Sequence, residues 1–289
     1  FTAATCISVS IVCAVGCGFL YHFQGKNGID CFPSGKVNLI YGEEILFFIF
    51  FLMWTYFAGF RPQAYGTEKF MDYGFMEAMM RSTTLPARDL WYSEGTINYY
   101  YGGQYFAVFL TKLTGSKVEL TYNLMRTFVA AFAFVLPFSL VRQMSVDRLK
   151  GSLTGKKRCL PAVAGIIAGL SVSIAGNMHY VVYSKIIPWI QKLQGREVDS
   201  YWFPDATRYI GYNPDVPIHE FPCYSFVLGD LHAHVVNVMF VLFLVGLLYA
   251  WMRSVRMREA VIMKPGRKQF WKKQLLIPHI LLAAVMIGM

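Results

Sequence analysis

Charged residues are scarce in this sequence. Only 15% of its 289 residues are Asp, Glu, Lys or Arg, whereas 55% are hydrophobic and the mean hydropathy is +0.40. Soluble domains carry roughly 25% charged residues. The apolar residues also occur in long runs, and a helix needs about 20 of them to cross the hydrocarbon core of a bilayer. The composition therefore excludes an ordinary soluble domain and predicts an integral membrane protein.

Several well-known active-site motifs are absent as well. The sequence has no Gly-rich P-loop, no GxGxxG after a strand, no GxSxG and no HExxH, so nothing indicates nucleotide chemistry. Its six cysteines form no CxxC pair and no Cys/His zinc spacing, and most lie in or beside apolar runs, as small core residues do. No inverted repeat is evident, which counts against a transporter without excluding one.

The charges that are present are mostly basic, with 27 Lys and Arg against 17 Asp and Glu. They are not interleaved with aromatic residues on one soluble face, as in nucleic-acid-binding proteins. They crowd two segments between apolar runs, 142–159 and 253–273, and such an excess marks cytoplasmic loops. We therefore expect no nucleic-acid partner, contacts with anionic membrane lipids, and a cytoplasmic position for both segments.

The fold expected from these patterns is all-α, a polytopic transmembrane helical bundle that forms a single domain over residues 1–289. The expected spans are 2–21, 45–60, 120–141, 160–182, 235–252 and 275–289. With both basic segments in the cytoplasm, two large loops, 61–119 and 183–234, lie on the extracytoplasmic side. Both chain ends fall in apolar runs, so we expect the sequence to be a fragment of a longer protein. Further membrane subunits are potential partners of that protein.

One apolar segment, Gly102–Leu113, is too short to span a membrane. Its aromatic residues suit the headgroup boundary, so we expect an interfacial helix over 102–113. Directly before it stand Asn98, Tyr99, Tyr100 and Tyr101. These rings could stack on sugars or form an aromatic belt against lipid, and composition does not separate the two. An aromatic belt does not explain the presence of Asn98 or of the two glycines after the tyrosines, Gly102 and Gly103.

The first large loop contains two acids, Glu68 and Asp72, at helical spacing. Residues four apart share one face of a helix. Such a pair could act as a general base with a supporting partner, or could bind a divalent cation. The simpler interpretation is a solvated helix start, where acids favour the N-terminal dipole.

The second large loop carries the densest polar cluster, with Asp230, His232 and His234 just before the fifth apolar run. On an extended backbone all three side chains point to one side and could ligate a metal or contact a phosphate, whereas on a helix only Asp230 and His234 share a face. Ionisable groups at a membrane entrance are costly, which favours function. Secondary candidates are Glu220, Asn177 and His179, although the last two could simply bond to neighbouring backbone.

Three stretches, Glu68–Asp72, Ile97–Gly102 and Glu220–His234, together resemble the YYY family of polytopic membrane proteins. That family in turn is similar to the GT-C superfamily of membrane glycosyltransferases, in which a span is followed by an external loop with an acidic catalytic residue. The second step is a fold-level analogy. The resemblance matches Asp72, and less closely Glu68, to that acid, while Phe70 and Cys223 depart from the family pattern.

The resemblance implies a glycosyltransferase of the cell envelope, in the plasma membrane, that passes a sugar from a polyprenyl-phosphate donor to an extracytoplasmic acceptor. In this hypothesis Asp72 is the general base and Glu68 orients it or helps to hold a divalent cation. The donor phosphate is balanced by Arg61, His232 and His234. The remaining candidate substrate-binding residues are Asn98, Tyr99, Tyr100, Tyr101, Glu220 and Asp230. Two alternatives stay open: a transporter or flippase of lipid-linked or ionic substrates, and a non-catalytic assembly subunit.

Overall fold

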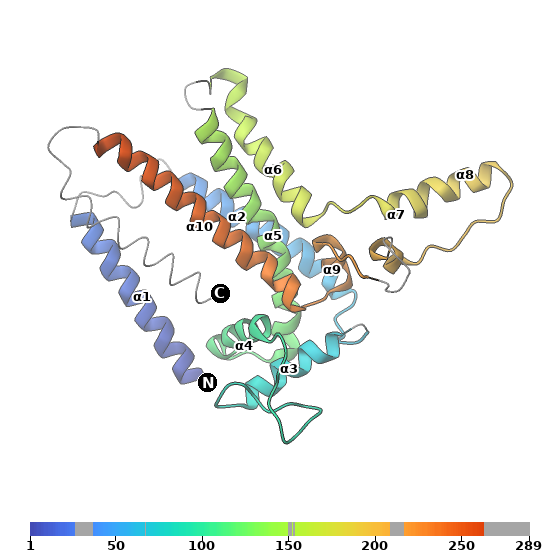
Figure 1. Ribbon diagram of the computed structural model, residues 1–289, viewed down its shortest axis with the longest axis horizontal. Coiled ribbons are helices and arrows are strands. Elements are labelled where there is room, and N and C mark those ends of the chain that lie inside the picture. Colours follow the sequence, from blue (N-terminus) through green and yellow to red (C-terminus); the bar gives the residue numbers. More distant parts are fainter. Residues whose placement is uncertain (27–36, 67, 150–151, 153, 209–216, 263–289) are drawn as a thin grey trace.

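The computed structural model describes residues 1–26, 37–66, 68–149, 152, 154–208 and 217–262. Over these residues the chain is helical, and its β pairing is limited to one isolated bridge between Arg88 and Thr96. Figure 1 shows long helices running alongside one another, with shorter helices across one end. The expected all-α class is confirmed.

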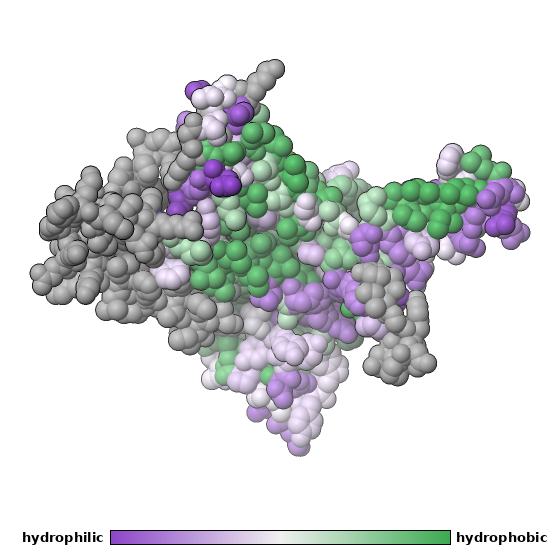
Figure 2. Space-filling view, turned by 45° about the horizontal axis from the view of Figure 1, so that its top comes forward, coloured by the Kyte–Doolittle hydropathy of each residue, from purple (hydrophilic) through white to green (hydrophobic). Residues whose placement is uncertain are grey.

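Three of the described helices are long and apolar enough to cross a membrane: α2 (Val37–Gly59), α5 (Val118–Arg148) and the Ala233–Arg253 part of α10 (Ala233–Ile262). The first helix, α1 (Ala3–Lys26), has a shorter apolar part, Ala3–Phe19. Figure 2 shows the matching surface, a hydrophobic region across the middle with hydrophilic residues above and below it. The chain is a helical membrane protein.

The fourth apolar run contains a helix that is shorter than the run. Helix α6 (Leu160–Ser173) follows the short 3-10 helix η2 (Gly155–Cys159) and has 14 residues, about 21 Å of helix. The chain then continues through α7 (His179–Val181), the π-helical turn η3 (Val182–Ile186) and α8 (Ile187–Leu193), which project away from the bundle in Figure 1. The predicted sixth span, 275–289, lies outside the described residues.

Helix α5 forms the centre of the bundle, packing against α2, α6 and α10. Its contact with α6 is close because α6 presents glycine there: a Cβ on Gly165 would lie 2.7 Å from the backbone oxygen of Phe138, and one on Gly169 would lie 2.7 Å from the Phe134 ring. Small residues at every fourth position let two helix backbones approach in this way.

Two amphipathic helices, α3 (Lys69–Arg81) and α4 (Gly102–Thr114), lie across the end of the bundle (Figure 1). The buried face of α3 follows helical spacing, with Phe75, Met76 and Met79 in the hydrophobic core. In its first turn the same face continues into two charged residues, Lys69 and Asp72, which are also buried. Helix α3 thus carries charge into the protein interior, and helix α4 coincides with the short helix expected over 102–113.

The short helix α9 (Pro222–Leu228) connects this region to α10. It has Pro222 in its first turn, where proline fits because no intrahelical N–H bond is needed, and it ends at Gly229 with φ +74°. Before it lies the 3-10 helix η4 (Phe203–Thr207). The residues between Gly229 and Ala233 form a short non-helical link that turns the chain into α10.

Candidate carboxylate–histidine site

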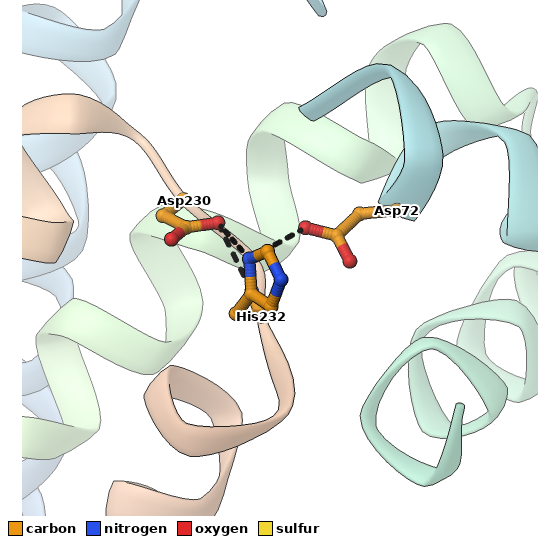
Figure 3. A group of neighbouring side chains, drawn as sticks. All are labelled: Asp72, Asp230 and His232. Atoms are coloured by element: carbon orange, nitrogen blue, oxygen red, sulfur yellow. Dashed lines mark hydrogen bonds and ion pairs between the residues drawn. The ribbon is translucent and has the colours of Figure 1, made fainter. Parts of the chain in front are cut away.

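Four side chains from two distant parts of the sequence meet where α3 faces the link between α9 and α10. We call this group, Glu68, Asp72, Asp230 and His232, the carboxylate–histidine cluster. Figure 3 shows His232 between the two aspartates, Asp230 from its own link and Asp72 from the first turn of α3. The cluster joins residues from both of the loops expected on the extracytoplasmic side.

The Asp72 side chain is fully buried, with 0% exposure. Its Oδ1 accepts a hydrogen bond of 2.7 Å from Nε2 of Gln104 on α4, and the same amide donates to the backbone oxygen of Leu231 at 3.1 Å. Gln104 therefore ties α3, α4 and the link before α10 together. The other carboxylate oxygen of Asp72, Oδ2, has no hydrogen-bond donor and lies 3.6 Å from His232 Nδ1.

The His232 imidazole is contacted by a carboxylate at each nitrogen. Its Nδ1 lies 3.0 Å from Asp230 Oδ1, and its Nε2 lies 2.5 Å from Glu68 Oε2. The backbone N–H of His232 also donates to Asp230 Oδ1 at 3.2 Å, which closes a tight turn of the link. The imidazole ring is thereby fixed in orientation.

Burial and charge shift the pKa values of these groups in different directions. Desolvation by burial raises the pKa of Asp72 to about 7, although His232 opposes the shift. The hydrogen bond with Asp230 raises the pKa of His232 to about 9, against the effect of its burial. Burial alone would raise the pKa of Asp230, but the bond from His232 holds it below its usual value. Perturbed groups of this kind are common at functional sites.

A second group shares Asp230 with this cluster. His234 Nε2 lies 2.8 Å from Glu220 Oε2, and Ser225 donates to the same carboxylate oxygen at 3.1 Å. Glu220, Asp230 and His234 offer ligand atoms within 4.8 Å of one another, as do Asp72, Asp230 and His232. The three residues expected to bind a metal together therefore divide between two triads that have Asp230 in common.

Gly229 of the link lines a cavity of about 650 Å³, which we call the arginine groove. Its apolar walls come from α2, α5 and α9 and include Trp54, Phe57 and Phe226, while Arg61 and Arg126 supply its charge. Arg126 is buried on α5, with 6% exposure, and donates from Nη1 to the backbone oxygen of Gly229 at 3.0 Å. Its buried Nε has no hydrogen-bond partner.

A second cavity, of about 790 Å³, lies between α4 and the start of α10, and we call it the tyrosine cavity. Tyr99, Tyr100 and Tyr105 line it, together with both histidines, His232 and His234. Helix α4 comes close to α10 at this point, because a Cβ on Gly103 would lie 2.9 Å from Cβ of Val236. The link thus borders an apolar groove with arginines through Gly229, and His232 of the link and His234 of α10 border an aromatic cavity.

Comparison with known protein families gives one match over the whole chain. Residues 1–289 match the family described as "Uncharacterized membrane protein (DUF2298)". The chain belongs to this family. Searches of curated proteins and of solved structures found no match. Membership of the DUF2298 family agrees with the helical membrane fold and specifies no activity.

Not every predicted site residue of this DUF2298 member lies at the cluster. Asn98 is exposed and does not line the tyrosine cavity, and Tyr101 packs against the hydrophobic core instead of lining that cavity. Asn177 donates to the backbone oxygen of Ala206 at 2.6 Å, and His179 lies 3.4 Å from the Tyr201 hydroxyl. The last two therefore hold the chain that follows α6, apart from the carboxylate–histidine cluster.

Three residues at the site were not predicted from the sequence: Lys69, Gln104 and Arg126. The sequence could have pointed to Arg126, because it lies inside the apolar run 120–141. Placing a charged side chain within a membrane span is costly, and such residues are commonly functional. Lys69 and Gln104 carried no such signal, since their burial depends on how α3 and α4 pack. Burial lowers the pKa of Lys69, with a further contribution from the charge of Arg126.

Proposed function

We propose that this protein is a membrane glycosyltransferase that moves a sugar from a polyprenyl-phosphate donor to an acceptor hydroxyl. The observation that carries the proposal is the position of Arg126. It is a buried arginine with an unpartnered Nε in an apolar groove between membrane helices, and it bonds to Gly229, next to Asp230 of the cluster. A lipid phosphate has the matching chemistry, an anionic head on an apolar chain.

The arginine groove is the proposed donor site. Arginine is suited to phosphate because its planar guanidinium presents several donors in a fixed geometry. Arg126 uses one of them on Gly229, and its guanidinium borders the groove, where its remaining donors would face a phosphate oxygen. Arg61, at the end of α2, is the second cation of the groove, and apolar side chains such as Phe57 would contact the lipid chain.

The tyrosine cavity is the proposed acceptor site. Aromatic rings stack on the apolar faces of sugars, and the exposed Tyr100 and Tyr105 line this cavity beside His232. The carboxylate best placed to receive a proton is Glu68, whose side chain is 60% exposed, whereas Asp72 is fully buried. The resemblance favours Asp72 as the base. Because Glu68 is the exposed carboxylate of the two, we assign the role of base to Glu68. The buried Asp72 holds the cluster together.

In the proposed reaction the acceptor oxygen attacks the anomeric carbon of the donor sugar and loses its proton to Glu68. A new bond forms between that oxygen and the anomeric carbon while the bond from this carbon to the phosphate oxygen breaks. Polyprenyl phosphate leaves with the electron pair of the broken bond. Arg126 and Arg61 stabilise the negative charge that develops on the phosphate. The expected place of reaction is the extracytoplasmic face of the plasma membrane.

The test is a transfer assay with the purified protein in vesicles, using a panel of polyprenyl-phosphate sugars labelled in the sugar. Formation of labelled glycan, or release of polyprenyl phosphate, is the expected result, and Glu68→Gln is expected to reduce it by at least about 100-fold. Glu94→Gln, in an exposed loop before α4, is the matched control and should retain activity. Equal activity of the Glu68 variant and wild type would refute the assignment of the base.

A transporter gives a different result in the same vesicles. It moves labelled lipid or ion across the membrane and forms neither glycan nor polyprenyl phosphate. Flux without product over the whole donor panel would replace the proposed function by the transport alternative.

A further inference from the structure

We infer that Asp72, Asp230 and His232 form a binding site for a divalent cation, of the kind represented by Mn²⁺. The inference goes beyond sugar transfer, because a cation site at these residues can be measured without any donor. Only the use of the ion during transfer rests on the proposed function.

The spacing of the ligand atoms fits one ion. Oxygen and nitrogen ligands lie about 2.0–2.2 Å from such ions, so neighbouring ligands in octahedral or tetrahedral geometry are separated by about 3.0–3.5 Å. His232 Nδ1 lies 3.0 Å from Asp230 Oδ1 and 3.6 Å from Asp72 Oδ2. The ligand atoms of the whole triad lie within 4.8 Å of one another.

The second observation is an unsatisfied oxygen. Asp72 Oδ2 is buried in a fully buried side chain and has no hydrogen-bond donor. A protonated His232 does not supply one, since the single proton of Nδ1 points to Asp230 Oδ1 at 3.0 Å. A buried polar atom without a partner destabilises the fold, and more so when it is charged. A cation between the three side chains would offset this destabilisation.

The third observation concerns the other side of the imidazole. His232 Nε2 lies 2.5 Å from Glu68 Oε2. Histidines that ligate metals through one nitrogen almost always donate from the other to a carboxylate or carbonyl, which fixes the ring and raises its basicity. Glu68 is placed to do this, and it leaves Nδ1 facing the two aspartates.

The charge of the cluster also favours a cation. Three carboxylates, Glu68, Asp72 and Asp230, surround one imidazole. Of the buried basic residues nearby, Lys69 and Arg126 interact electrostatically with Asp230. Among the described residues, neither forms an ion pair with Asp72. Two carboxylate oxygens and one imidazole nitrogen suit Mn²⁺ or a similar first-row ion better than Ca²⁺, which takes six to eight oxygen ligands.

The experiment is a Mn²⁺ titration of the detergent-solubilised full chain, stripped with a chelator and without donor, followed by the EPR signal of free Mn²⁺. Wild type is expected to bind one ion. Asp72→Asn should weaken binding at least about tenfold, and Glu68→Gln by about 10- to 100-fold, the usual effect of a residue that orients a ligand. Glu94→Gln, in the exposed loop before α4, is the matched control and should leave the affinity unchanged, while Glu220→Gln tests the neighbouring triad.

Two outcomes would overturn the inference. One is absence of Mn²⁺ binding by wild type at millimolar concentration. The other is loss of binding with Glu220→Gln but not with Asp72→Asn, which would move the ion to Glu220, Asp230 and His234. Because Asp72→Asn could also unfold the protein, His234→Gln supplies an independent readout: a nitrogen coupling to bound Mn²⁺ in pulsed EPR of this variant supports His232 as ligand, and its absence refutes the triad. Metal binding without transfer, or transfer without metal binding, separates this inference from the proposed function.

Discussion

His232 Nδ1 lies 3.6 Å from Asp72 Oδ2, although the two residues belong to different loops of the sequence. The contact exists because α3 and α4 pack beneath the link between α9 and α10, where Gln104 bonds to both sides. The site is therefore a product of helix packing, and changes to that packing should be measurable in stability as well as in activity.

Gln104→Leu is expected to destabilise the protein. The substitution removes the donor for Asp72 Oδ1 and for the Leu231 backbone oxygen, leaving two buried acceptors unpaired at about 1–3 kcal/mol each. The measurement is the free energy of unfolding in mixed detergent micelles. Gln63→Leu, at an exposed position, is the control and should change stability by less than about 0.5 kcal/mol. Equal effects of both variants would contradict the role of Gln104.

Gly229→Ala is expected to cost more stability than Gly115→Ala. Both glycines end a helix with positive φ, +74° and +66°, so both substitutions carry a backbone cost of about 1–2 kcal/mol. Only at Gly229 would the new Cβ collide with the Arg126 guanidinium, whereas nothing lies within 4 Å at Gly115. The difference between the two unfolding free energies measures the collision. A difference near zero would show that Arg126 moves freely.

Gly165→Ala is expected to destabilise the bundle, against the usual effect of alanine in a helix. Alanine normally stabilises a helix by about 0.5–1 kcal/mol relative to glycine. Here the methyl group would lie 2.7 Å from the backbone oxygen of Phe138, and overpacking of this kind costs about 1–3 kcal/mol. Gly246→Ala, on α10 with nothing within 4 Å, is the control and should be neutral or stabilising. Unfolding by increasing SDS fraction compares the two.

Arg126→Gln is expected to weaken the binding of polyprenyl phosphate by at least about tenfold, since a hydrogen bond to a charged group contributes about 1.5–3 kcal/mol. Binding can be followed by native mass spectrometry of the protein with the lipid, alongside a thermal melt that verifies folding. Arg148→Gln removes the same charge from the far end of α5 and serves as the control. Equal lipid affinity of the two variants would reject the arginine groove as the donor site.

The membrane orientation can be measured with single cysteines in a cysteine-free background. Glu94→Cys, in the loop before α4, is expected to react with a membrane-impermeant maleimide on intact cells. Ser152→Cys, in the basic segment after α5, should react only after permeabilisation, because segments rich in Lys and Arg stay in the cytoplasm. Both positions are exposed in the structure, so accessibility depends on the side of the membrane. The reverse labelling pattern would invert the predicted topology.

The candidate site shows where sequence reasoning succeeds and where it stops. Ionisable groups at the entrance of an apolar run are costly to bury, which predicted a functional role for Asp230 and His232. The structure places these two side chains in contact. The spacing of Glu68 and Asp72 predicted that both lie on one helix face, with Asp72 as the base and Glu68 as its partner. The structure instead exposes Glu68 before the first turn of α3 and buries Asp72. Spacing gives relative direction along a helix, but burial depends on what packs against it.

The membrane class and the helical fold were determined by the sequence alone, because a bilayer forces every long apolar run to satisfy its backbone within the segment. The assignment of the two basic segments to the cytoplasm, and of the two large loops to the opposite side, rests on the positions of Lys and Arg. This topology stays a prediction. Only the tertiary structure decided that Asp72, Asp230 and His232 converge, and that Arg126 enters a groove beside them. These contacts depend on close packing between helices far apart in the sequence, for which local periodicity carries no information.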